Sequence, residues 1–404
     1  MIPPAVERRA RWVLDTLGAR EARFGDDVPY SPRAWEQLER GERPQGDELA
    51  DAFFHLARLE ERGAPRDAHG RFPASASCLD PLRPPLERLR ERLGLEAPRW
   101  AGAKFAVALT HDVDIPWRWT RIGVRGAAAR LRDNVRAGRV GTAAREARGL
   151  ATIPVHRARG TDPNWRFDRI LATERERGAH STFFVMAAHR HRADGPSPET
   201  YDRLRPRLVD TIRDGGAEVG LHGSYAAAAD DALLADEKER LEALAGAVAG
   251  QRYHFLRLDP HANLTPLERL GFAYDTSLGF AETPGFRAGI AHPFRPWDVA
   301  GERPLDLVEI PLAAMDATFE DRYLGLSAKR AEPVLMGLLD WASEHGGAFA
   351  VLWHTNRFDR GTSGGWDRLY ERVLDGVGER GGACVGAGEL ADQVRRRFDQ
   401  RPQG

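Results

Sequence analysis

Two aspartates separated by one residue follow a short apolar run. The run covers residues 105–110, is rich in small and β-branched side chains, and is therefore predicted to be a buried strand. Because side chains alternate along a strand, Asp112 and Asp114 are expected to share one face while Val113 packs the other way. Such a pair suits metal-assisted chemistry, in which one carboxylate binds a divalent metal and the other acts as a general base for water. A solvated acidic turn after a strand is the alternative.

The chain around this motif alternates between predicted strands and helices. Strands are predicted at residues 105–110, 181–186, 218–222, 254–258, 274–277, 307–312, 348–354 and 383–385. Helices are predicted at residues 167–177, 201–214, 233–248, 328–344, 366–380 and 389–398. This alternation favours parallel βα units, and in a βα barrel the carboxyl ends of the strands share one rim. The side chains expected to converge there are Asp112, Asp114, His222, Arg257 and His354.

Composition restricts the class of protein. The 404 residues with 42% hydrophobic content are enough for one large core and a smaller unit, and the net charge of -1 implies no overall attraction to nucleic acid or membrane. Cys78 and Cys384 follow neither a zinc nor a redox spacing, which is typical of reduced thiols in a cytosol. The amino terminus lacks the apolar core of a signal peptide, and no run approaches membrane-spanning length. A cytoplasmic protein with no nucleic-acid partner is predicted.

Residues 117–160 form a strongly basic insertion after the first strand. Eleven arginines stand there against Asp133 and Glu146, a local charge of +9. With Trp117, Trp119 and Ile122 beside this charge, the segment could be a surface for anionic lipid or for a phosphorylated glycan carrier. A solvated, arginine-rich helical hairpin is the favoured alternative, because no long apolar face accompanies the charge.

Several segments together resemble the NodB-type polysaccharide deacetylases, carbohydrate esterase family 4. They are Thr110-His-Asp-Val-Asp114, Thr182-Phe-Phe-Val185, Glu218-Val-Gly-Leu-His222 and Val351-Leu-Trp-His354, within a resemblance that covers about residues 104–398. The resemblance implies an α/β fold, a distorted (β/α) barrel over residues 99–404 with the insertion at 117–160. Residues 1–98, mostly helical or irregular, resemble the smaller amino-terminal leader domain of one branch of that family.

The resemblance also implies roles for single residues. Asp112 would be the catalytic base, Asp114 and His222 metal ligands, Arg257 the residue that orients the base, and His354 the general acid. A guanidinium can hold a carboxylate ionised and fixed, and a histidine has the right pKa range for proton donation. Arg287 is expected either to contact an anionic or hydroxyl-rich substrate or to form a salt bridge in a loop.

The sequence departs from the family at the second metal-binding histidine. The family carries two histidines four residues apart, whereas Ala226 stands four residues after His222. The vacancy is filled by another residue or by water, or the site binds metal weakly or not at all. Candidate replacements, among which spacing does not choose, are His111, His254, His261 and His292.

The function implied is metal-dependent removal of the N-acetyl group from an acetamido sugar, either a cytoplasmic sugar precursor or a lipid-linked glycan intermediate. Zinc is the default ion for such a site, and cobalt, manganese or iron are also chemically plausible. Two alternatives stay open. One is a non-catalytic glycan-binding protein that kept the barrel after losing the metal, and the other is an amidase of the same fold that acts on a small amide.

Overall fold

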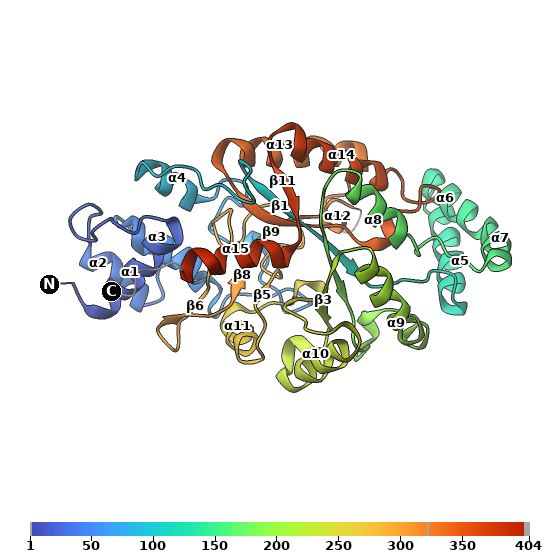
Figure 1. Ribbon diagram of the computed structural model, residues 1–404, viewed down its shortest axis with the longest axis horizontal. Coiled ribbons are helices and arrows are strands. Elements are labelled where there is room, and N and C mark those ends of the chain that lie inside the picture. Colours follow the sequence, from blue (N-terminus) through green and yellow to red (C-terminus); the bar gives the residue numbers. More distant parts are fainter. Residues whose placement is uncertain (1, 321–322, 400–404) are drawn as a thin grey trace.

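The core of the molecule is a curled parallel sheet (Figure 1). The computed structural model describes residues 2–320 and 323–399. Within them the strand order is β8-β5-β4-β3-β2-β1-β10-β9, with β11 paired to β1, and every pairing in this sheet is parallel. The bounds are β1 Ala106–Val113, β2 Thr182–Val185, β3 Glu218–Gly223, β4 Gly250–Tyr253, β5 Tyr274–Asp275, β8 Val308–Glu309, β9 Leu312–Met315, β10 Ala348–Leu352 and β11 Ala383–Val385.

Amphipathic helices follow most of these strands and cover the outside of the sheet. They are α8 Phe167–Arg175, α9 Pro198–Asp214, α10 Asp231–Ala245, α11 Pro260–Arg269, α13 Ala328–His345, α14 Trp366–Glu379 and α15 Ala387–Asp399. The helix α14 shows why they pack this way: Trp366, Leu369, Tyr370, Val373 and Val377 are buried at helical spacing. The predicted fold class, an α/β distorted barrel with a smaller amino-terminal unit, is confirmed.

Short helices precede the barrel and pack against one of its ends (Figure 1). They are α1 Pro4–Leu17, α2 Pro32–Glu39, α3 Glu48–Leu56, η1 Leu59–Glu61, η2 Ala74–Ala76 and α4 Pro85–Arg92. Buried Asp47 caps α3 by accepting from the backbone of Ala50 at 3.0 Å and also accepts from the Trp35 indole at 2.9 Å. Trp12 packs against Trp297 of the barrel, with ring centroids 5.3 Å apart and the rings tilted by 46°. The division of the chain at residue 98 stays a prediction.

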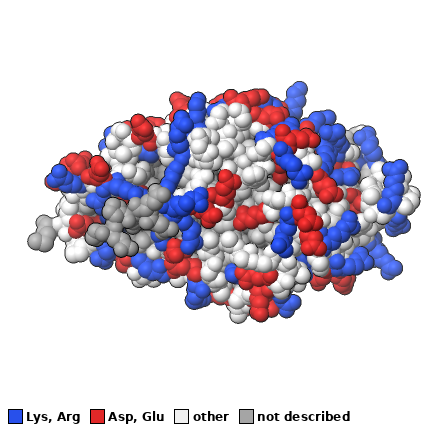
Figure 2. Space-filling model, viewed as in Figure 1, with Lys and Arg blue, Asp and Glu red and all other residues white. Residues whose placement is uncertain are grey.

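The basic insertion forms a helical unit at the opposite end of the molecule from α1–α3 (Figure 1). It consists of α5 Arg121–Arg136, α6 Val140–Ala151 and α7 Ile153–Arg159. Thr120 caps α5 by accepting from the backbone of Gly123 at 3.0 Å. Figure 2 shows Lys and Arg side chains gathering over this end of the surface.

One predicted strand was wrong in a way that matters for the site. The strand predicted at residues 254–258 is β4 at Gly250–Tyr253, and residues 254–256 instead form a tight turn, η5. Phe255 and Leu256 have left-handed backbones, with φ of 62° and 55°, so extended chain cannot continue past His254. The strands β6 Trp297–Asp298, β7 Arg303–Pro304 and β9, and the helix α11, were not predicted as separate elements.

Candidate active site

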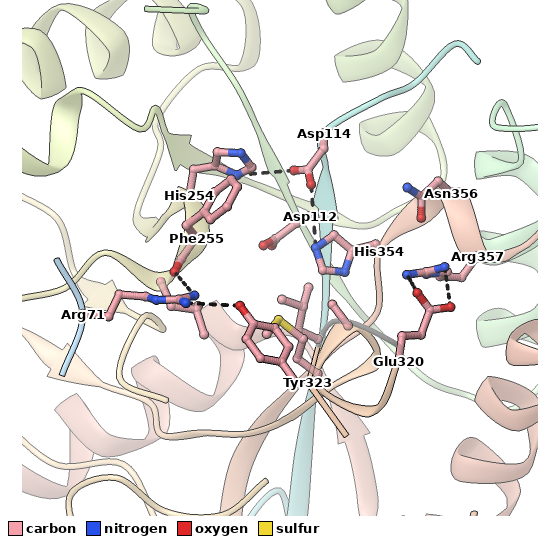
Figure 3. A pocket seen from close by; sticks show the side chains of 14 residues that line it. Arg71, Asp112, Asp114, His254, Phe255, Glu320, Tyr323, His354, Asn356 and Arg357 are labelled. Carbon is pink, nitrogen blue, oxygen red and sulfur yellow. Dashed lines mark hydrogen bonds and ion pairs between the residues drawn. The ribbon is translucent and has the colours of Figure 1, made fainter. Parts of the chain in front are cut away.

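Asp112 and Asp114 open into one cavity at the carboxyl end of β1 (Figure 3). The cavity has a volume of about 240 Å³, and His254 and His354 line it as well. Val113, between the aspartates, is fully buried in the hydrophobic core. The alternation of side chains along the strand therefore gives two carboxylates at one place, because the strand continues to Val113 before it ends.

Arg252 of β4 holds Asp112. Its Nη1 atom donates to Asp112 Oδ1 at 2.9 Å and lies 2.9 Å from the Thr110 hydroxyl, and its guanidinium packs over the Phe184 ring at 4.6 Å. Arg252 is fully buried and Asp112 is 3% exposed. A charge-assisted bond in such surroundings fixes the position of the carboxylate.

The predicted contact between Arg257 and Asp112 was wrong. Arg257 donates to the backbone carbonyls of His69, at 2.8 Å, and of Tyr225, and its guanidinium lies 3.9 Å above the Tyr225 ring. The physical reason is the earlier end of β4, because the tight turn after it directs Arg257 into the surrounding loops. Arg252, five residues earlier, makes the contact that was expected of Arg257.

Asp114, His222 and His254 form a buried group whose ligand atoms lie within 4.8 Å of one another. His222 Nε2 is 3.3 Å and His254 Nδ1 is 3.7 Å from Asp114 Oδ1, and the two imidazole nitrogens are 2.9 Å apart. A carboxylate oxygen and two imidazole nitrogens are a donor set that zinc accepts. His254 comes directly after β4, which is the neighbour of β3 in the sheet. It therefore takes the place of the histidine that is absent at position 226.

The backbone fixes which nitrogens of these histidines face the group. His222 Nδ1 lies 2.9 Å from the Arg252 carbonyl, and His254 Nε2 lies 3.0 Å from the Ala193 carbonyl. Carbonyl oxygens only accept, so each of these nitrogens carries the hydrogen. In the neutral rings, the other two nitrogens then point lone pairs at each other and at a carboxylate. Such an arrangement requires a positive charge between them, either a proton or a metal ion.

Electrostatics act differently on the members of this group. Burial lowers the pKa of His222, but Asp112 and Asp114 outweigh it and raise that pKa, whereas the pKa shifts of Asp114 and His254 favour their ligating forms. Burial raises the pKa of Asp114, but the nearby His254, His354 and His222 outweigh this and lower that pKa well below its usual range. Burial lowers the pKa of His254 more than Asp114 raises it, so the neutral, ligating form is favoured. Asp114 Oδ1 is buried and accepts no hydrogen bond from the described residues. The residues present therefore fit a divalent metal.

The other three candidate histidines lie elsewhere in the described part of the chain. His111 is buried with its Nε2 atom 2.8 Å from Glu174 Oε1 and its Nδ1 atom 2.8 Å from the Trp353 carbonyl. His261, on α11, contacts the carbonyl of Arg58 at 3.0 Å, and His292 is buried 3.7 Å from Glu87. Each of the three has a structural environment of its own.

His354, at the end of β10, faces Asp114 across the cavity (Figure 3). Its Nε2 atom is 3.7 Å from Asp114 Oδ2, and its Nδ1 atom is 2.5 Å from Asp316 Oδ1. Arg357 donates to the other Asp316 oxygen at 2.9 Å. Burial lowers the pKa of His354, but Asp316 outweighs it, and the net effect raises that pKa to about 9.

Sequence reasoning missed both Arg252 and Asp316, each of which holds a predicted catalytic residue. Asp316 begins the short helix α12, Asp316–Phe319, directly after β9. The signal that could have indicated Asp316 is an acidic residue at the end of a strand. The strand in this region was predicted at residues 307–312, whereas β9 begins at Leu312, so Asp316 was not recognised as a strand-end residue. Arg252 was hidden by the shift of β4.

The amino-terminal segment contributes a wall of the cavity. Arg71 donates to the Phe255 carbonyl at 3.1 Å and to the Tyr323 hydroxyl at 3.1 Å (Figure 3), and the His69 ring lies 4.7 Å from that of Phe255. A left-handed backbone costs a non-glycine residue roughly 1–2 kcal/mol, and two such residues follow His254. The contacts of Arg71 and His69 therefore brace the turn that carries His254.

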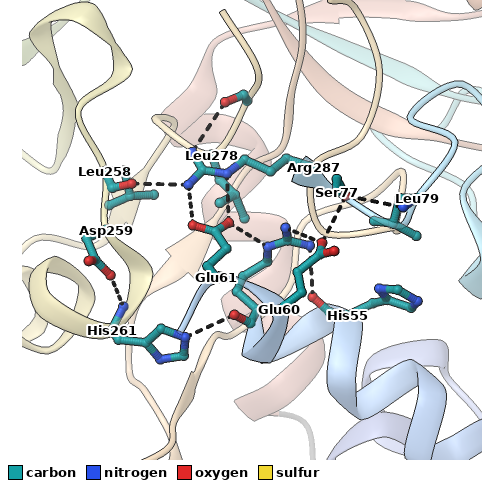
Figure 4. Close-up of polar contacts among 12 residues, drawn as sticks. His55, Glu60, Glu61, Ser77, Leu79, Leu258, Asp259, His261, Leu278 and Arg287 are labelled. Carbon is teal, nitrogen blue, oxygen red and sulfur yellow. Dashed lines mark hydrogen bonds and ion pairs between the residues drawn. The ribbon is translucent and has the colours of Figure 1, made fainter. Parts of the chain in front are cut away.

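Arg287 belongs to a buried ion-pair network between the amino-terminal segment and the barrel (Figure 4). It is 1% exposed and donates to Glu61 at 2.6 and 2.9 Å and to the Leu258 carbonyl at 3.2 Å. Arg58 donates to the same Glu61 at 2.9 Å. Of the two predicted roles of Arg287, the salt bridge is the one observed.

Comparisons with known proteins bear on the fold. No family model and no curated protein matches the chain. A probable polysaccharide deacetylase from Pseudomonas aeruginosa PAO1 aligns with a TM-score of 0.50 and 16% identity, over 76% of this chain and 96% of that one. A protein assigned as a polysaccharide deacetylase from Mycobacterium smegmatis aligns with a TM-score of 0.48, 22% identity and coverage of 76% and 96%. Puue Allantoinase aligns with a TM-score of 0.48, 15% identity and coverage of 76% and 95%.

At these identities the likeness establishes the fold alone. The match to the Pseudomonas protein, together with the curled parallel sheet, shows that the two proteins share this barrel fold. The function of the candidate site depends on the geometry of this chain's own residues, because one fold can carry many functions.

Proposed function

We propose that the chain is a metal-dependent deacetylase that hydrolyses the N-acetyl group of an acetamido sugar or glycan intermediate. The observation that supports this most is that a base, an acid and a group that could hold a metal meet in one place. A fixed carboxylate, Asp112, and an acid, His354, line the same cavity as Asp114 and His254, and His222 completes the metal-binding group. A hydrolase that attacks an amide needs a base, an acid and stabilisation of a developing oxyanion, and these residues can supply all three.

Asp114, His222 and His254 would hold the metal, and zinc is the proposed ion. When bound, it would polarise the acetyl carbonyl and lower the pKa of water. Each imidazole already donates the N–H of its non-ligating nitrogen to a backbone carbonyl, at 2.9 and 3.0 Å. Such contacts fix ring orientation and are the usual support of metal-ligating histidines.

Asp112 is the proposed base. Arg252 occupies Asp112 Oδ1, whereas Oδ2 lies on the side of His222, 3.6 Å from its Nε2 atom. The second oxygen is therefore the one placed to take a proton from attacking water. Holding the carboxylate by one oxygen orients it without using its capacity to accept that proton.

His354 is the proposed acid that protonates the departing amine. Asp316 accepts a hydrogen bond from Nδ1 of the protonated ring, which leaves Nε2–H directed toward the cavity. The pKa of about 9 means that the ring is protonated at neutral pH. Arg357 fixes Asp316 from its other oxygen, so the acid is held at a defined place.

Acetate release and metal content, measured on the same samples, test the proposal. The full chain, loaded with zinc, is incubated with tetra-N-acetylchitotetraose and with a panel of small linear and cyclic amides. The proposal expects acetate from the glycan, loss of both acetate release and zinc in Asp114→Ala, and loss of acetate release alone in Asp112→Asn. Glycan binding without any hydrolysis would favour the non-catalytic alternative, and hydrolysis of the amides alone would favour an amidase.

The role of the insertion at residues 117–160 is a proposal of its own. In the described part of the chain, no helix combines the length and the apolar character needed to cross a membrane. A peripheral contact with an anionic membrane or a lipid-linked glycan stays a prediction from the local charge of +9. The space between the insertion and the barrel gives more specific information.

A further inference from the structure

A second cavity lies between the insertion and the barrel. Its volume is about 640 Å³, and we call it the basic groove, lined by Arg118, Arg130 and Arg145 of the insertion and by Asn356, Ser363 and Trp366 of the barrel, among others. Asn356 and Arg357 line the catalytic cavity as well. The groove therefore adjoins the site where the acetamido group would react, with Asn356 and Arg357 at their common wall. A glycan longer than one sugar could extend from one cavity into the other.

The inner end of the groove suits neutral sugar hydroxyls. Arg357 is there, but its charge is balanced by Asp316 at 2.9 Å and Glu320 at 2.7 Å. The Oδ1 atom of Asn356 is buried and has no hydrogen-bond partner among the described residues. An unpaired buried acceptor at the junction of two cavities costs free energy, which a hydroxyl donor from a ligand would recover.

The outer end carries uncompensated positive charge. Arg118 and Arg130 share one carboxylate, that of Glu146, each at 2.8 Å. Arg145 donates to the Thr142 hydroxyl at 3.1 Å and has no acidic partner within the described residues. Three guanidinium groups against one carboxylate give this end a charge of +2 where they line the cavity, with Arg130 and Arg145 also exposed to solvent. Positive charge concentrated in a cleft attracts anions.

We propose that the basic groove binds an anionic group, a carboxylate or a phosphate, attached to the glycan beside the sugar that is deacetylated. The substrate class is then an acidic glycan or glycan phosphate, with its acetamido sugar at Asp112 and its anion near Arg145. The placement of the acetamido sugar at Asp112 rests on the proposed function, and the placement of the anion near Arg145 rests on the groove alone. Arg145 is a specificity residue in this account, because it lies beyond the reacting atoms.

The test compares ligands that share one acetamido sugar and differ in charge. Calorimetry on the zinc-loaded full chain, in an Asp112→Asn background to prevent turnover, measures binding of tetra-N-acetylchitotetraose, which is neutral, and of a heparosan tetrasaccharide, which carries glucuronates. N-Acetylglucosamine 1-phosphate forms the phosphate arm. Arg145→Ala is the test variant. Arg157→Ala is the matched control, since Arg157 is exposed on α7 and does not line the groove.

We expect at least one anionic ligand to bind about tenfold or more tightly than chitotetraose at low salt. Arg145→Ala should lower the affinity for that anionic ligand by about tenfold and leave the affinity for chitotetraose unchanged. Arg157→Ala should change neither affinity. The preferred arm identifies the anion as carboxylate or phosphate. Equal affinity for charged and neutral ligands, no binding of any of them, or equal losses in the two variants would overturn the groove. Phosphatidylglycerol vesicles form a further arm of the test. If Arg145→Ala weakened binding to the vesicles alone, the proposal would be rejected and the groove would be identified as a lipid-binding surface.

Acetate release, measured in parallel without the Asp112 substitution, separates this proposal from the function on which it rests. Charge-dependent binding that responds to Arg145 but produces no acetate would leave the groove intact and reject the deacetylase. Acetate release from chitotetraose and heparosan at equal rates, with no effect of Arg145→Ala, would leave the deacetylase intact and reject the groove.

Discussion

The Nε2 atom of His222 lies 2.9 Å from the Nδ1 atom of His254, and both nitrogens face Asp114 Oδ1. The two histidines come from neighbouring strand ends and not from one helical or loop motif. Ala226 therefore does not leave the candidate metal site with two residues, because His254 offers a third ligand atom from a different place in the chain.

Replacing Asp316 should impair the acid without removing the metal. Asp316→Asn exchanges a charged acceptor for a neutral amide beside His354 Nδ1, 2.5 Å away. We expect kcat for acetate release to fall by roughly 10²-fold or more, the usual scale for a positioned acid or base. Zinc content should be unchanged, because Asp316 is not in the metal-binding group. Unchanged kcat would show that His354 does not depend on Asp316.

Removing Arg252 should cost stability as well as activity. Arg252→Ala leaves Asp112 buried without its guanidinium partner, and unpaired buried charges cost about 3–5 kcal/mol. Chemical denaturation should show a loss of that size. Arg257→Ala serves as the comparison, since Arg257 holds loops and does not touch Asp112. If Arg257→Ala impairs turnover more than Arg252→Ala does, the assignment of the orienting arginine is wrong.

Arg71 should influence metal affinity through the turn that carries His254. Arg71→Ala removes the hydrogen bond to the Phe255 carbonyl, and the left-handed backbone at Phe255 and Leu256 loses a brace. We expect zinc affinity to fall by roughly 10-fold, at the lower end of the effects of outer contacts on metal ligands. Cobalt loading gives an independent readout, because the visible spectrum reports ligand geometry.

The control for Arg71 is Arg62→Ala, which removes an exposed arginine from the same segment. Zinc affinity and the cobalt spectrum should match those of the unsubstituted chain. If the cobalt spectrum and the zinc affinity are also unchanged in Arg71→Ala, the turn after His254 does not depend on Arg71.

Acid should weaken the contact between the amino-terminal segment and the barrel. Burial raises the pKa of Glu61, but Arg287 and Arg58 outweigh it and lower that pKa from 4.5 to about 2. A lowered folded-state pKa gives stability that is present above pH 4.5 and is lost as the pH falls toward 2. The shift corresponds to about 3 kcal/mol. Glu61→Gln should therefore be less stable at pH 7 and show a shallower decline of unfolding free energy between pH 4.5 and 2. An equally steep decline in the variant would contradict this role.

The sequence predicted four residues at strand ends: Asp112, Asp114, His222 and His354. The prediction followed from the alternation of strands and helices, from the period-two alternation of side chains along a strand, and from the resemblance to the deacetylase motifs. The turn at His254 did not, because neither Phe255 nor Leu256 is a glycine or asparagine that would indicate a left-handed backbone. Loops packed against that turn stabilise it, through Arg71 and His69. The strand was predicted to begin at residue 254, four residues after the true start of β4. Arg257 was therefore predicted to hold Asp112 in place of Arg252.

Contacts between distant segments were equally beyond the sequence. Asp316 meets His354 across 38 residues, and Glu61 meets Arg287 across 226. Neither spacing contains a local signal, because both depend on how β9, β10 and the amino-terminal helices come together. Charge composition did locate the basic insertion, but only the structure shows that a groove between it and the barrel shares Asn356 and Arg357 with the cavity at Asp112.

Equilibrium zinc binding by the full chain tests the central claim most directly. The account predicts one zinc ion per chain, at least about 100-fold weaker binding in His254→Ala, and unchanged binding in His261→Ala, which removes a histidine from α11 outside the metal-binding group. No zinc uptake by the unsubstituted chain, or the same affinity in His254→Ala and His261→Ala, would contradict it.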